Sequence, residues 1–153
     1  MRSLLATCAA SVAVVALVSP SSTAAAAGTC KPIRAETETF ATGPATFAGT
    51  ATGTLGGEPF SGAVTTTVTS APEPAGASGV LFATTSHEIA LPAGTITTSD
   101  VARLVPTKEI GVYRLITHAT VVEGATGQLA LNGTVNFVDG SAEAQISGVV
   151  CPG

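Results

Sequence analysis

Gln128-Leu-Ala-Leu-Asn-Gly-Thr-Val-Asn-Phe-Val138, Asp139-Gly140 and Ser141-Ala-Glu-Ala-Gln-Ile-Ser-Gly-Val-Val150 form the segment that most clearly specifies the architecture of this chain. Apolar or small residues alternate with polar ones in both halves, which is the period of a β-strand with one buried face. Asp-Gly favours a tight turn because glycine tolerates positive φ. The segment therefore predicts a hairpin. The residues on its apolar face are Leu129, Leu131, Gly133, Val135 and Phe137, then Ala142, Ala144, Ile146, Gly148 and Val150.

Other parts of the chain show the same pattern less clearly. Thr and Val are abundant and fit a pleated surface better than a helix, and Gly and Pro recur too often for long helices. The further predicted strands are Ile33–Phe40, Thr46–Leu55, Phe60–Ser70, Val80–Leu91, a short stretch near Val101–Val105, and Tyr113–Glu123. The predicted connections are Gly56–Pro59, Ala71–Gly79, Gly94–Asp100 and Pro106–Gly111, with a possible helical turn that begins at Ser99 or Asp100.

The regular spacing of these strands predicts an all-β fold. About eight short strands separated by turn residues are typical of a closed barrel or a sandwich. Closure removes the Thr- and Val-rich edge strands that would otherwise invite aggregation. We therefore expect residues 28–153 to form one domain, a single closed antiparallel barrel of about eight strands.

The first 27 residues have the order of a secretory signal peptide. Met1-Arg2-Ser3 is positively charged, Leu4–Val18 is apolar, and Ala24–Ala27 offers small residues for cleavage. The apolar run covers about 15 residues, fewer than the roughly 20 that span a bilayer. We expect cleavage after Ala27, with Ala26 as the neighbouring option, so that the protein is secreted to the extracellular or cell-envelope space without a transmembrane anchor.

Three cysteines become two when this segment is removed. Cys8 lies within the expected signal peptide, whereas Cys30 and Cys151 lie near the two ends of the remaining chain. A secreted protein with two cysteines usually pairs them. We therefore predict a Cys30–Cys151 disulfide that ties the termini together.

The composition excludes several classes of function. Charged residues make up 10% of the chain, aromatic residues 4%, and the formal net charge is -4. These values disfavour a nucleic-acid-binding protein. His87 and His118 are the only histidines and the acidic residues are scattered, so we expect neither a metal site nor a cofactor. The oligomeric state is left open.

The C-terminal half resembles secreted bacterial proteins with an allene-oxide-cyclase-like barrel, which are related to plant dirigent proteins. The matching residues are Val121–Phe137, Asp139-Gly140 and Ile146–Cys151, together with Thr95–Asp100 and Gly111–Leu115 upstream, so that the resemblance covers roughly residues 80–151. It implies an eight-stranded antiparallel barrel whose interior holds a hydrophobic small molecule. Plant members isomerise a substrate or guide its cyclisation in that cavity, but no catalytic residue carries over to this sequence.

The residues that could contact a ligand are few. Arg114 and His118 share one face of the Tyr113–Glu123 strand, and Glu88 is a nearby acid on Val80–Leu91. If they faced the lumen, they could orient a polar ligand group, and a histidine could supply acid–base chemistry. The alternative is that all three belong to the solvated outer face.

Three functions remain open at this point. The small side chains of the predicted inner faces could leave a void, which favours binding of a small hydrophobic molecule in the barrel lumen. One alternative is a barrel isomerase or cyclase of the allene-oxide-cyclase type. The other is a non-catalytic envelope or interaction protein with a filled core. Because polar residues are scarce, we favour binding over catalysis and name no catalytic residue.

Overall fold

The computed structural model describes residues 28–153, and its strands all belong to one sheet. The strands are β1 (Lys31–Gly43), β2 (Thr46–Leu55), β3 (Glu58–Val68), β4 (Glu73–Pro74), β5 (Leu81–Leu91), β6 (Gly94–Pro106), β7 (Val112–Glu123), β8 (Thr126–Asn136) and β9 (Ser141–Cys151). A short 3-10 turn at Gly76–Ser78 separates β4 from β5. The expected signal peptide, with Cys8, lies outside the described residues.

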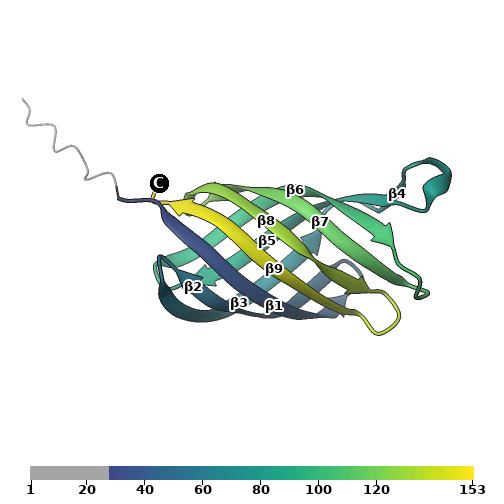
Figure 1. Ribbon diagram of the computed structural model, residues 1–153, viewed down its shortest axis with the longest axis horizontal. Coiled ribbons are helices and arrows are strands. Elements are labelled where there is room, and N and C mark those ends of the chain that lie inside the picture. Colours follow the sequence, from purple (N-terminus) through teal and green to yellow (C-terminus); the bar gives the residue numbers. More distant parts are fainter. Residues whose placement is uncertain (1–27) are drawn as a thin grey trace, which may run out of the picture.

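The long strands close into a barrel. Each pairs antiparallel with its neighbours in sequence, and β1 also pairs with β9. The sheet closes where Val64–Val68 of β3 pairs with Thr85–Ile89 of β5. The result is an eight-stranded antiparallel barrel with β4 as an extra strand on β5, and a closed barrel excludes the sandwich. Figure 1 shows β4 and the following turn extending beyond one end of the barrel.

The hairpin predicted from residues 128–150 is confirmed. Strands β8 and β9 pair in register from Thr126–Cys151 to Asn136–Ser141. Gly140 has φ of 75°, which glycine adopts without a Cβ clash. Asp139 holds the turn, because its carboxylate accepts hydrogen bonds from the Ser141 backbone N–H (2.8 Å) and hydroxyl (2.7 Å). Phe137 differs from the expected buried position: it lies just beyond β8 and is 46% exposed.

The prediction for residues 94–100 was wrong, whereas the short strand predicted near Val101–Val105 is confirmed as the second half of a longer strand. Gly94–Asp100 is not a connection, and no helical turn begins at Ser99 or Asp100, because the whole segment Gly94–Pro106 is strand β6. Thr98 and Asp100 point inward in alternation with exposed neighbours. The alternation was hidden because these two inward-facing residues are polar.

The two ends of the barrel differ. The predicted Cys30–Cys151 disulfide is present at one end, here called the disulfide end, where β1 begins beside the end of β9. The turns β1–β2 and β8–β9 and the connection from β3 to β5 lie at the opposite end, here called the mouth end. Figure 1 places the C-terminus at the disulfide end, on the left.

Candidate functional site

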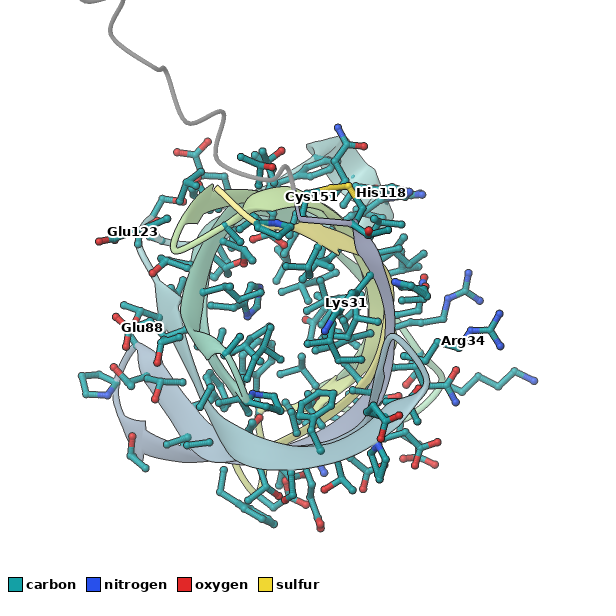
Figure 2. All side chains as sticks on the ribbon, turned by 90° about the vertical axis from the view of Figure 1, so that its left-hand side faces the viewer. Lys31, Arg34, Glu88, His118, Glu123 and Cys151 are labelled. Carbon is teal, nitrogen blue, oxygen red and sulfur yellow. A yellow bond between two sulfur atoms is a disulfide. The ribbon has the colours of Figure 1, made fainter. Side chains whose placement is uncertain are left out.

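The three residues expected to contact a ligand lie on the outer surface. Arg114 and His118 are exposed on β7, and Glu88 is exposed on β5. Figure 2, which looks along the barrel from the disulfide end, shows Glu88 and His118 outside the ring of strands. Strand β6 separates them, so the structure does not bring Glu88 together with the other two. Outward-pointing side chains do not reach a molecule in the lumen.

The lumen at the disulfide end is filled with apolar side chains. Ile33 and Ile89 are fully buried there, and Phe60, Leu129 and Val121 pack in the same cluster. Interiors of this kind are close-packed, with few voids larger than a water molecule. This half of the barrel is therefore a solid core that stabilises the fold.

The half toward the mouth end contains a cavity of about 90 Å³. The floor of the cavity is the side of the packed cluster that faces the mouth end. The two share the side chains of Val64, Ile89, Leu131 and Ile146. A wider surface depression of about 510 Å³ lies at the mouth. The cavity and the depression share the side chains of Phe47, Val68, Pro72 and Phe137, so the two spaces adjoin.

A chain of hydrogen-bonding side chains runs along the inner wall of the barrel over four neighbouring strands, β3, β5, β6 and β7. Thr66 Oγ1 on β3 lies 2.8 Å from His87 Nδ1 on β5. His87 Nε2 lies 3.5 Å from Asp100 Oδ2 on β6. The hydroxyl of Thr117 on β7 donates to the same carboxylate at 2.5 Å, and that of Thr85 donates to its other oxygen. We call Thr66, His87 and Asp100 the lumen relay.

The surroundings of Asp100 stabilise its charged form. Burial by itself raises the pKa of this carboxyl, since a low-dielectric interior penalises charge. Hydrogen bonds from His87, Thr117 and Thr85 and the Coulombic attraction of His87 act in the opposite direction and prevail, so the pKa of Asp100 lies below its usual value. Asp100 is therefore an ionised carboxylate with a fully buried side chain.

Only two of the three residues of the lumen relay line the cavity. Thr66 and His87 belong to the cavity wall, whereas Asp100 does not. Thr98, directly across from His87 on β6, is fully buried and its hydroxyl has no hydrogen-bond partner in the described structure. A molecule in the cavity therefore meets Thr66, Thr85 and His87, whereas Asp100 lies behind them.

Sequence reasoning missed most of this site. His87 enters only as one of two histidines, Asp100 is predicted as a possible start of a helical turn, and neither Thr66 nor Thr117 is predicted as a site residue. The available signal was the alternation Ile96, Thr98, Asp100, Ala102, Leu104, which places Asp100 on an inner face. That His87 and Asp100 are neighbours depends on the register of β5 and β6, in which His87 opposes Thr98 and Thr85 opposes Asp100.

Within residues 28–153, no three His, Cys, Asp or Glu side chains come close enough together to hold a metal ion. In the same part of the chain, no helix has the length and apolar character needed to cross a membrane.

Comparison of the sequence with known family models gives no match, and comparisons with curated proteins and with solved structures give none either. The resemblance to allene-oxide-cyclase-like barrels rests on the residues quoted above and stays a prediction.

Proposed function

We propose that this protein binds a small, mostly apolar molecule in the mouth half of its barrel. The observation that carries the proposal is the unequal filling of the lumen. One half is packed with the side chains of the core cluster, and the other encloses a cavity that adjoins a depression at the mouth. A barrel selected only for stability gains from filling both halves, because lining atoms next to a void lose dispersion contacts.

The dimensions of the two spaces limit the ligand. Pockets for drug-sized ligands usually measure about 300–1,000 Å³, so the cavity of about 90 Å³ accepts only one end of such a molecule. The adjoining depression of about 510 Å³ offers room for the remainder. Val64, Leu131 and Val135 are typical of the walls around the inserted end. A narrow, largely hydrocarbon ligand that enters end-on fits this shape.

We further propose that the protein works outside the cytoplasm. The support is the order of residues 1–27, which is that of a signal peptide, and the disulfide between Cys30 and Cys151, a bond that persists in oxidising compartments. A barrel-bound apolar molecule would then be carried through an aqueous phase.

The first test is native mass spectrometry of the protein purified from its own culture supernatant, followed by thermal-shift measurements with a panel of lipids and terpenoids. We expect a co-purifying small molecule or a stabilising ligand. Ala102→Leu places a larger side chain in the cavity wall and should abolish the effect, whereas Val101→Leu on the outer face should not. If Ala102→Leu does not fold, Ala142→Leu replaces it.

Two results would contradict the proposed binding function or its location. No bound molecule and no thermal shift across the panel would contradict the proposal and favour an envelope or interaction protein. Equal ligand binding by Ala102→Leu and the parent protein would place the site elsewhere.

A second candidate function is that of a barrel isomerase or cyclase, and the lumen relay is the observation that favours it. A histidine backed by a buried carboxylate at a cavity wall is a common arrangement for proton transfer. Such a base would remove an α-proton from a bound ketone and return a deuteron in D₂O. Deuterium uptake by 2-hexanone that is faster with the parent protein than with His87→Ala would support catalysis, and equal uptake would leave binding alone.

A further inference from the structure

Thr66 holds a special position among the hydroxyl groups of the cavity. Thr37 and Thr39 also line it, but their hydroxyls donate to the carbonyl oxygens of Ala144 (3.2 Å) and Ala142 (3.1 Å) on β9. Thr85 also lines the cavity, but its hydroxyl donates to the Asp100 carboxylate. The Thr66 hydroxyl is instead directed at a histidine nitrogen, His87 Nδ1. Its hydrogen-bonding capacity therefore depends on the relay, not on the barrel backbone.

The relay leaves Thr66 one free hydrogen-bonding function in either charge state of His87. Ionised Asp100 requires a proton on the facing Nε2. In the neutral imidazole Nδ1 then carries a lone pair, so the Thr66 hydroxyl donates to it and its oxygen accepts from a ligand. In the imidazolium Nδ1 donates to the Thr66 oxygen, and the hydroxyl proton is offered to a ligand. Thr66 thus accommodates either a donor or an acceptor.

Few other atoms of the cavity wall are free to form a hydrogen bond with a polar group of a ligand. Both ring nitrogens of His87 have partners, Thr66 on one side and Asp100 and Thr85 on the other. Asp100 is screened from the cavity. Most of the remaining side chains of the wall are apolar, including Ile89, Leu104, Leu115 and Leu131.

We propose that Thr66, positioned by His87 and Asp100, binds the oxygen of a hydrocarbon that carries a single alcohol or ketone function and enters the lumen oxygen-first. This inference rests on the proposed binding function and specifies its ligand class. The net gain from one such hydrogen bond corresponds to roughly a two- to tenfold preference over the matching hydrocarbon. Ligands with charged head groups would bind less well, because the apolar walls do not compensate a buried charge.

The test compares 1-hexanol, 2-hexanone and hexane in NMR titrations of the intact protein. We expect 1-hexanol, which can donate or accept, to bind roughly two- to tenfold more tightly than hexane, and 2-hexanone, which only accepts, to share this gain in the imidazolium form of His87. Thr66→Val keeps the shape of the side chain and should remove this preference, whereas Thr66→Ser should retain it. Thr39→Val is the matched control, since it removes a cavity hydroxyl that already donates to the backbone.

The possible outcomes separate the two proposals. If hexane binds the parent protein as tightly as 1-hexanol and 2-hexanone, or if Thr66→Val keeps the preference, the role of Thr66 is overturned while lumen binding stands. If none of the three binds, the binding function itself fails. Circular dichroism of each variant verifies folding, and Thr66→Ser supplies the comparison if Thr66→Val does not fold.

Discussion

Asp100 is an ionised side chain within an otherwise largely apolar lumen, and its neighbours make that charge tolerable. The carboxylate accepts hydrogen bonds from Thr85 and Thr117 and faces His87 Nε2 at 3.5 Å. Removal of one partner from a buried network leaves the others unsatisfied, which costs more than the net gain from an ordinary hydrogen bond. Substitution of a residue in the lumen relay should therefore lower the free energy of unfolding of the barrel.

Asp100→Asn should lower the free energy of unfolding at neutral pH by about 1–3 kcal/mol, because hydrogen bonds to a charged acceptor are replaced by weaker ones. The measurement is urea denaturation of the parent protein and the variant. Glu88→Gln is the control, since Glu88 is exposed on the outer face of the same region and should change stability by less than about 0.5 kcal/mol. Equal destabilisation by the two substitutions would contradict this role of Asp100.

Asp100 also makes a contribution to acid stability whose sign follows from its pKa. The folded-state pKa lies below the unfolded value of 3.8, so the contribution is present above that value and is lost as the pH falls through the folded-state pKa. The stability difference between the parent protein and Asp100→Asn should therefore narrow as the pH is lowered below about 4. A difference that stayed constant down to about pH 2 would show that the charge of Asp100 is not its cause.

At the scale of the elements, β8 depends on a glycine that lies close against the backbone of β9. A Cβ added at Gly133 would lie 1.9 Å from the carbonyl oxygen of Glu143 on β9, a backbone atom that cannot move without opening the pair. At Gly43, near the end of β1, an added Cβ would meet nothing within 4 Å. These two positions form a natural pair for substitution.

Gly133→Ala should destabilise the barrel by about 1–3 kcal/mol through strain on the β8–β9 pair. Gly43→Ala should be neutral or stabilise it slightly, because alanine reduces the conformational freedom of the unfolded chain. Thermal and urea unfolding of the two variants check this. A Gly133→Ala protein as stable as Gly43→Ala would show that β8 and β9 are less closely apposed at this point.

The strands that were clearest in the sequence are those with apolar inner faces. In β8 and β9 the inward Leu129, Leu131 and Ile146 alternate with polar neighbours, and the turn at Gly140 joins them. The first half of β6 failed because Thr98 and Asp100 face inward, so a polar inner face resembled a loop. The missed half of β6 and the missed site coincide, because the polar inward residues that disguised this strand, Thr98 and Asp100, belong to the candidate site or adjoin it.

The candidate ligand residues named from sequence lie on the outer surface, the alternative that the sequence left open, for a related reason. Arg114 and His118 were correctly assigned to one face of β7, but alternation alone does not say which face is inside. The inner face of β7 is that of Leu115, Thr117 and Ala119. The juxtaposition of Thr66, His87 and Asp100 needs the closure between β3 and β5 and the register of β5 on β6, which no local pattern specifies.

At the scale of the whole molecule, the disulfide and the β1–β9 pairing join the two termini. The bond spans 121 positions of sequence, and the strands pair from Lys31–Val150 to Phe40–Ser141. A cross-link over a loop of this length restricts the unfolded chain strongly. We expect the native barrel to remain closed without it, since ten consecutive residues of β1 are paired with β9.

The double substitution Cys30→Ser and Cys151→Ser should therefore lower the free energy of unfolding by roughly 2–5 kcal/mol while the far-ultraviolet spectrum of the folded state is unchanged. Non-reducing mass mapping of the parent protein should show the Cys30–Cys151 peptide. Free thiols at both positions would contradict the disulfide. Loss of the β spectrum in the double variant would contradict the view that strand pairing alone keeps the barrel closed.

Lumen binding is tested most directly by intermolecular nuclear Overhauser effects between 1-hexanol and the methyl groups of the protein. Val64, Ile89 and Leu131 form the floor of the cavity, so their methyl groups should show contacts with the bound alcohol. The exposed methyl groups of Val101 and Val122 on the outer face should show none. Contacts confined to outer methyl groups, or none at saturating 1-hexanol, would contradict a ligand site in the mouth half of the barrel.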